Sequence, residues 1–187
     1  MGAPRARRAV VVGRAQGALE EYAAARSLCS FDCVLVVGAM LTCFPHRVDH
    51  VVSFHVELFD MWADERTRAG LPPAGCYWGA RYRGRCLGQD TTRASPLRYA
   101  DCVGGSSGFL AAEGVALGAL GAEKVVLAGV PMLASAAHEG DPASWDEADV
   151  YWATWEEHLP QLLGRVKSMS GRTRDALGAP TKEWLEA

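Results

Sequence analysis

The residues of this sequence that are best suited to chemistry lie in one glycine- and serine-rich turn: Gly104, Gly105, Ser106, Ser107 and Gly108. Glycines let backbone N–H groups approach an anion closely, and serine hydroxyls add further donors. A helical pattern follows the turn, and the first N–H groups of a helix are unpaired and carry a partial positive charge. The turn therefore predicts a phosphate site; the alternative is a glycine-rich loop with serine as a plain helix cap.

Two histidines could act as an acid or a base, and each has a carboxylate nearby in the sequence. His55 ends an apolar run and lies two residues before Glu57, whereas His138 lies in a small-residue loop, three residues before Asp141. Either histidine could deprotonate an acceptor hydroxyl, and a surface or capping role is the alternative. The histidines before residue 55 fall on alternating faces of an extended segment, so no metal site is expected.

Shorter glycine turns follow two other expected strands and add candidates for nucleotide or phosphate binding. Gly13, Arg14 and Gly17 belong to a turn after residues 9–12, and Gly38 follows residues 33–37. The first of these turns is not the dinucleotide fingerprint GxGxxG, and no acidic residue stands at the expected offset. A nicotinamide cofactor is therefore not expected.

Basic residues gather in two later segments. Five arginines lie between residues 81 and 98 against a single acid, Asp90, which indicates either a contact loop for phosphate or nucleic acid or a solvated connection. Near the C-terminus, arginines and a lysine surround a Ser-Met-Ser-Gly turn. There Ser170, Gly171 and Arg172 predict a second clamp for an anion.

Apolar runs and helical patterns alternate along the chain, and this alternation decides where the candidate residues lie. Strands are expected at residues 9–12, 33–37, 48–54, 76–83 and 124–128, and helices at 18–28, 56–68, 107–120 and 146–158. Such alternation predicts one Rossmann-like α/β domain over residues 1–187, with a mostly parallel sheet and helices on both faces. Ligands bind at the carboxyl ends of the strands in such sheets, so the turns that follow strands carry the most weight.

Composition narrows the class of protein further. No apolar run approaches the roughly 20 residues that span a bilayer, so we expect a cytoplasmic protein with no membrane partner. The six cysteines form no CxxC pair, which favours reduced core thiols. The net charge of −3 argues against a generic nucleic-acid coat but leaves local nucleic-acid binding and association of identical chains open.

The order of four segments carries a resemblance to a known group of proteins. The segments are VVVGRAQGAL, CVLVVGAML, VDHVVSFHVELFDMW and GGSSGFLAAEGVALGALGAEKVVLAGVPM. Together they resemble the Rossmann-like superfamily of archaeal 6-hydroxymethylpterin diphosphokinase-like proteins and bacterial CMP-sialic-acid sialyltransferases. The likeness is closest to small bacteriophage members, whose tails resemble SMSGRTRDALGAPTKEWL, and it covers nearly the whole chain.

The resemblance implies that the strand-end turns bind a nucleotide. Arg14 stands where an Asn is common, Gly38 lies near the position of a second Asn, and Pro131 replaces the usual Asp of a G-x-D turn. Since those side chains orient the nucleotide, its identity does not carry over. In the sialyltransferases a downstream histidine acts as the base, and His138 is the nearest candidate here.

The resulting expectation is a nucleotide-dependent transferase that moves a sugar from a nucleotide-sugar donor, with a nucleobase or nucleic acid in a phage setting as one acceptor. The phage setting would place the protein in the host cytoplasm. One alternative is an ATP-dependent diphosphokinase acting on a pterin-like alcohol, the only version that calls for Mg²⁺. Another is a binding protein without catalysis. No tightly bound cofactor is expected, because the nucleotide is the substrate.

Overall fold

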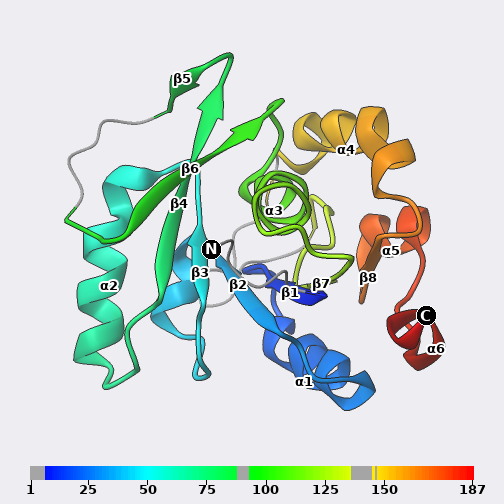
Figure 1. Cartoon of the computed structure of the whole chain (residues 1–187), viewed down its shortest axis with the longest axis horizontal. Coiled ribbons are helices and arrows are strands. Elements are labelled where there is room, and N and C mark those ends of the chain that lie inside the picture. The colour runs from blue at the N-terminus through cyan, green and yellow to red at the C-terminus, as the bar shows by residue number, and fades with distance from the viewer. Residues whose placement is uncertain (1–6, 88–92, 136–144, 146) are drawn as a thin grey trace.

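A single sheet forms the centre of the protein (Figure 1). The computed structural model describes residues 7–87, 93–135, 145 and 147–187. Its strands are β1 (Arg8–Val12), β2 (Cys33–Val37), β3 (His50–Val52), β4 (Cys76–Tyr82), β5 (Arg85–Cys86), β6 (Leu97–Cys102), β7 (Lys124–Ala128) and β8 (Val166–Ser168). Their order is β5-β4-β3-β2-β1-β7-β8, with β6 also paired to β4. The β4–β5 pair is antiparallel and the other described pairs are parallel.

Helices cover both faces of the sheet. They are α1 (Ala18–Leu28), the 3₁₀ turns η1 (Gly38–Thr42) and η2 (Val56–Leu58), α2 (Phe59–Arg68), α3 (Ser107–Phe109) with its π-helical continuation η3 (Leu110–Ala119), α4 (Ala148–Leu162), α5 (Gly171–Leu177) and α6 (Lys182–Glu186). Side chains alternate along β1. Val10 and Val12 belong to the core beneath α1 and α2, whereas Ala9 and Val11 belong to the core beneath η3 and α4.

The strand order reverses beside β1, and this reversal places the ligand-binding edge. From β1 the chain passes through α1 to β2 on one side, and later through η3 to β7 on the other side. Connections that leave in opposite directions open a crevice at the carboxyl ends of the two strands. The crevice between β1 and β7 is therefore the place in this sheet where a ligand is expected.

The α/β class predicted from the sequence is confirmed, with a mostly parallel sheet and helices on both faces. The strand order is also compatible with a Rossmann-like arrangement. Gly114 shows why the helix after residue 107 is rich in small residues: a Cβ atom there would lie 2.8 Å from the carbonyl oxygen of Asp101 in β6. Within the described part of the chain, no helix is long and apolar enough to cross a membrane.

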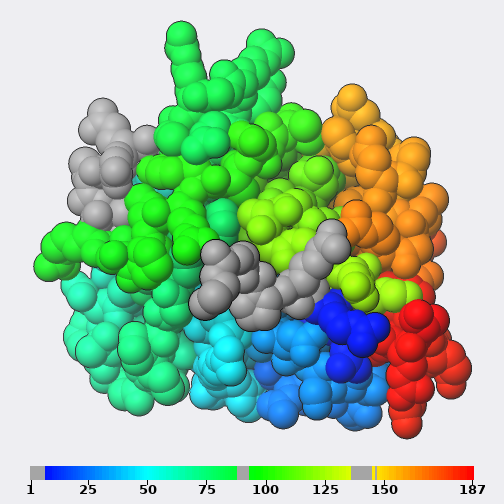
Figure 2. Space-filling view, in the orientation of Figure 1, coloured from blue at the N-terminus to red at the C-terminus, as the bar shows by residue number. Residues whose placement is uncertain are grey.

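Some elements differ from the sequence prediction. The segment before residue 102 contains strand β6, which the sequence did not indicate because exposed polar side chains interrupt its apolar pattern. Helix α4 continues through Pro160 to Leu162, beyond the predicted end at residue 158. The β4–β5 hairpin projects from the body of the molecule, at the top of Figure 2. All six cysteines are free, as predicted, but only Cys33, Cys76 and Cys102 are buried core thiols; Cys43 and Cys86 are exposed. Burial raises the pKa of the Cys33 thiol to about 12.

Candidate functional site

A cavity of about 500 Å³ opens at the carboxyl ends of β1 and β7. This volume lies within the range of small-molecule sites. The turns after four parallel strands and the start of α3 contribute most of its wall, and α2 and the start of α4 complete it. The lining residues are Gly13, Arg14, Ala15, Val37, Gly38, Ala39, Ser53, Phe54, His55, Trp62, Gly105, Ser106, Ser107, Gly108, Gly129, Val130, Pro131, Met132, Trp145, Glu147 and Tyr151. Most of the phosphate-binding residues predicted from the sequence therefore meet in one place.

The turns after β1 and β7 interlock to form the floor of the cavity. The Gly13 N–H donates to the carbonyl oxygen of Ala128 at 2.7 Å, and a Cβ atom on Gly13 would overlap the carbonyl oxygen of Gly129. Glycine is needed here for the close approach of two backbones. The Gly129 N–H in turn donates to the Glu21 carboxylate at 2.6 Å.

The start of helix α1 is less suited to an anion than its glycine turn suggests. Gly17, the N-cap residue of α1, does not line the cavity. Two glutamates, Glu20 and Glu21, occupy the first turn of the helix. Carboxylates already satisfy the positive end of a helix in this position. The phosphate-binding role that the sequence predicts for Gly17 thus finds no support in this geometry.

The turn before α3 uses both of its serine hydroxyls within the protein. The Ser106 hydroxyl accepts a hydrogen bond from the Phe109 N–H at 3.3 Å, which makes it a helix cap. The Ser107 hydroxyl accepts from the Phe54 N–H at 3.2 Å and so joins the helix to the turn after β3. The N–H groups of Ser107 and Gly108 belong to the first helical turn, where backbone donors have no partner within the helix. The groups of this turn that remain available to an anion are therefore backbone amides.

Two glycines of the same turn play different parts. Gly108 lies against Val130, and a Cβ atom on it would lie 2.9 Å from the Val130 side chain. Gly104 has a φ of 119° and does not line the cavity. Gly38, at the end of β2, also has a positive φ, 53°, and packs beside Trp62 in the cavity wall.

Arg14 brings a positive charge to the cavity. Its side chain is half-buried, and it forms no ion pair with any other described residue. The other residues of the described lining that can carry charge are His55 and Glu147. A half-buried guanidinium without a carboxylate partner in the described chain is a suitable group for holding a phosphate.

His55 and Glu57 form a hydrogen-bonded pair at the rim. The His55 Nδ1 atom lies 3.0 Å from the Glu57 carboxylate, and the His55 N–H donates to the hydroxyl of the buried Ser53 at 2.9 Å. A hydrogen bond from the Glu57 backbone N–H, followed by the His55 contact, holds the pKa of the Glu57 carboxyl below its usual value. Of these two residues, only His55 lines the cavity. Glu57 orients the imidazole through Nδ1, which leaves the Nε2 atom for a ligand.

Aromatic side chains form walls that the sequence did not indicate. Trp145 and Tyr151 stack with ring centroids 5.8 Å apart, and Phe54 and Trp62 line the cavity as well. Trp152 and Trp155 are not part of this wall, because both are buried in the core. The available signal for the wall was position: Phe54 lies two residues after β3, and Trp145 lies three residues before α4.

The second predicted clamp lies against the cavity from outside. The Arg172 N–H donates to the carbonyl oxygen of Pro131 at 2.8 Å, and its guanidinium pairs with Asp149 at 2.7 Å. Gly171 has a φ of 65°, and a Cβ atom on it would overlap Pro131. Neither Ser170, Gly171 nor Arg172 lines the cavity. The geometry assigns them to holding α5 in place, and an anion site at this turn stays a prediction.

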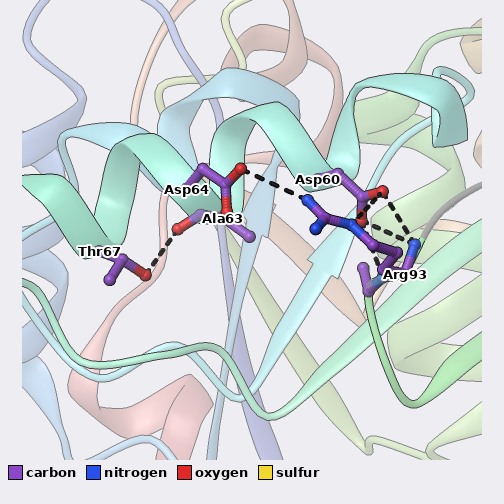
Figure 3. A network of polar contacts seen from close by, with 6 residues as sticks. Asp60, Ala63, Asp64, Thr67 and Arg93 are labelled. Atoms are coloured by element: carbon purple, nitrogen blue, oxygen red, sulfur yellow. Dashed lines mark hydrogen bonds and ion pairs between the residues drawn. The ribbon is translucent and has the colours of Figure 1, made fainter.

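Acids from other parts of the chain neutralise two of the arginines between residues 81 and 98. Figure 3 shows Arg93 beside Asp60 and Asp64 of α2, where its guanidinium forms an ion pair with each at 3.5 Å. Asp60 also accepts hydrogen bonds from the backbone N–H groups of Arg93 and Ala94. In the hairpin, Arg81 pairs with Asp101 at 3.7 Å. The segment therefore has less unpaired positive charge than its own sequence suggests, because acids outside it pair with two of its arginines.

His138 and Asp141 lie outside the described residues. Within the described ranges, no group of three or more His, Cys, Asp or Glu side chains is placed to hold a metal ion. Comparison with protein-family models, with curated proteins and with solved structures gives no match to this chain. The resemblance to the Rossmann-like transferases therefore stays a prediction from short motifs.

Proposed function

We propose that the protein is a nucleotide-dependent transferase that moves a sugar from a nucleotide-linked donor to an acceptor hydroxyl. One observation carries the proposal: the cavity at the β1/β7 crevice combines Arg14, the first backbone amides of α3 and aromatic walls. A nucleotide presents the matching features, namely phosphates beside a planar ring. The motif resemblance, which names a diphosphokinase and a sialyltransferase group, supports the same class of ligand.

In this proposal the two ends of the donor occupy different parts of the cavity. The amides of Ser107 and Gly108 and the Arg14 guanidinium hold the phosphates, because oriented donors and a cation stabilise charge strongly in a partly enclosed site. The nucleobase of the donor lies against an aromatic wall such as the Trp145 and Tyr151 pair. This arrangement leaves the sugar near the rim, where His55 lies.

The chemistry assigned to the rim is a single displacement. The acceptor oxygen forms a bond to the anomeric carbon of the sugar while the bond from that carbon to the donor phosphate oxygen breaks. The acceptor proton moves to the Nε2 atom of His55, and the electron pair leaves with the phosphate, whose added charge Arg14 offsets. Glu57 holds the imidazole through Nδ1 and stabilises the imidazolium that forms.

Nucleotide binding is tested by calorimetry with nucleoside diphosphates and nucleotide sugars. Arg14→Gln is expected to weaken binding by about 10- to 100-fold, since a charged hydrogen-bonding partner of the phosphate is lost. Arg68→Gln is the matched control, because Arg68 is exposed at the end of α2, away from the cavity. If no nucleotide binds, or if the two variants behave alike, the proposed site is wrong.

Catalysis is tested by following donor hydrolysis and transfer to mixed acceptor alcohols. His55→Gln is expected to lower kcat by about 10²- to 10⁴-fold while nucleotide affinity is kept, and Glu57→Gln by a smaller factor. His158→Gln is the control, since His158 lies on α4 outside the cavity lining. Binding without any turnover, unchanged by His55→Gln, would replace the transferase with a nucleotide-sequestering protein.

A diphosphokinase is the second candidate, and Glu147 is the observation that favours it. A diphosphokinase needs Mg²⁺, which is held by one or two carboxylates together with substrate phosphates. Glu147 is the carboxylate of the described cavity lining. Release of AMP from ATP in the presence of an alcohol, lost in Glu147→Gln, would support this activity over sugar transfer.

A further inference from the structure

The β4–β5 hairpin extends the sheet past the carboxyl end of β3, the strand that leads to His55. Strand β6 pairs with residues 77–82 along one edge of β4, so β3 and β5 share the other edge. The last paired residue of β3, Val52, lies opposite Trp78, and β4 continues for four more residues, or about 13 Å. Cys86, the end of β5 nearer to β3, pairs with Arg81, three residues further along β4 than the Trp78 partner of Val52.

The side chains of the hairpin divide between two faces. Arg81 pairs in register with Asp101 of β6, so both lie on one face, where they form an ion pair. Tyr82 lies on the opposite face, opposite Arg85 in β5 and Cys102 in β6. Tyr82 packs against the core beneath η3 and α4, so its face is also the face on which helix α3 begins.

Two arginines remain available on this face. Arg83 and Arg85 are exposed, and neither forms an ion pair with another described residue. The Arg83 guanidinium lies over the Tyr82 ring, 5.1 Å from its centroid. The hairpin thus presents two cations and an ordered aromatic–guanidinium pair on one face of the sheet.

We propose that this hairpin binds single-stranded nucleic acid, with Arg83 and Arg85 against backbone phosphates and the Tyr82–Arg83 pair beneath a base. Bases stack on aromatic rings and on guanidinium planes, and stacking tolerates any sequence. A single strand fits better than a duplex, because two cations that are unpaired within the described chain cannot match the many phosphate contacts that duplex binding uses. An acidic peptide offers carboxylates for the arginines but no base to stack.

The binding itself is independent of the activity proposed for the cavity. Only one consequence depends on the proposed function: if the cavity holds a nucleotide-sugar donor, a strand that extends from the hairpin to the turn after β3 becomes the acceptor. The two ideas can therefore fail separately. Arg14→Gln weakens nucleotide binding without touching the hairpin, and a hairpin variant weakens strand binding without touching the cavity.

Fluorescence anisotropy of a labelled short oligothymidylate tests the proposal with the full chain. For two phosphate contacts, the logarithm of the affinity is expected to fall with the logarithm of salt concentration with a slope of about −1.4. The double variant Arg83→Ser/Arg85→Ser is expected to lose at least about tenfold in affinity and nearly all of this slope. Arg81→Ser, on the opposite face of the same hairpin, is the matched control and is expected to change little.

Two more measurements complete the test. Tyr82→Leu is expected to weaken binding by roughly tenfold and Tyr82→Phe to keep it, with thermal unfolding confirming that both variants are folded. The proposal is overturned if the double variant binds as the original protein does, or if Arg81→Ser loses as much. It is also overturned if polyglutamate competes as well as unlabelled oligothymidylate, because the hairpin is then a general polyanion contact.

Discussion

Helices α3 and α5 both begin at a serine-glycine turn, yet the two turns differ in what lies against them. At α3, the residues after Ser106 line the cavity, and their first amides face no helical partner. At α5, the Arg172 N–H donates to the carbonyl oxygen of Pro131. One helix start is left for a ligand, and the protein's own backbone occupies the other.

The difference shows that such a motif does not define a binding site by itself. Both turns have glycine, serine and the positive end of a helix, which are the features that favour an anion. The turn at α5 packs against the loop after β7, and residues 130–132 of that loop line the cavity. The α5 turn therefore acts on the site indirectly, by fixing the position of a cavity wall.

The largest effect is expected from Gly171→Ala. The substitution combines a positive φ of 65° with overlap between the new Cβ atom and Pro131, so the free energy of unfolding should fall by about 3 kcal/mol. Urea denaturation measures this loss. Gly164→Ala is the control, because Gly164 has a φ of 80° with open space around it and should cost only about 1 kcal/mol. Equal losses would mean that α5 is not packed against the loop as described.

Thr173→Val is expected to have the next largest effect. The buried Thr173 hydroxyl donates to the carbonyl oxygen of Val130 at 2.6 Å and lies 2.8 Å from the Ser168 hydroxyl. Valine fills the same space but leaves these groups without their partner, at a cost of about 2 kcal/mol. Thr67→Val on the exposed face of α2 should change stability by less than about 0.5 kcal/mol.

A functional readout separates the two roles of Thr173. If the hydroxyl fixes the wall of the cavity, nucleotide affinity should fall in Thr173→Val even where the protein remains fully folded. Unchanged affinity together with lower stability would show that α5 supports the fold alone, and that the loop after β7 keeps its position without it.

The sequence was most informative about elements that depend on local patterns. Helix α1 and strands β2 and β7 have the bounds that their apolar patterns predict. Strand β6 was missed because it is an edge strand, and its pairing with β4 joins residues about twenty positions apart. The contact of Asp60 with Arg93 is likewise long-range, so no window of sequence around Arg93 reveals it.

For the candidate site, the sequence predicted positions better than roles. It placed the turns after β1, β2, β3 and at the start of α3, and these turns do meet around one cavity. It could not show that the two serine hydroxyls are hydrogen-bonded within the described chain whereas the amides are not. That difference depends on which neighbour lies within hydrogen-bond distance. The aromatic wall depends on how α4 packs, which a local pattern does not contain.

A smaller difference in stability is expected between alanine substitutions of the serines in the two turns. Ser106→Ala removes a helix cap whose hydroxyl accepts from the Phe109 N–H, so about 1 kcal/mol of stability should be lost. The Ser170 side chain makes no such cap at α5, and Ser170→Ala should cost less than about 0.5 kcal/mol. Thermal unfolding of the pair measures both. A larger loss for Ser170→Ala would reverse the assignment of the two turns.

Amide hydrogen exchange compares the two turns most directly, and it requires no substitution that changes stability. In the free protein the N–H groups of Ser107 and Gly108 should exchange quickly, whereas the Arg172 N–H should be protected by its bond to Pro131. Adding a nucleoside diphosphate should slow exchange at Ser107 and Gly108 and leave Arg172 unchanged, because only the first turn is open to a ligand. Protection that appears at Arg172 instead would move the anion site to α5, since the nucleotide would then have to displace the Pro131 carbonyl.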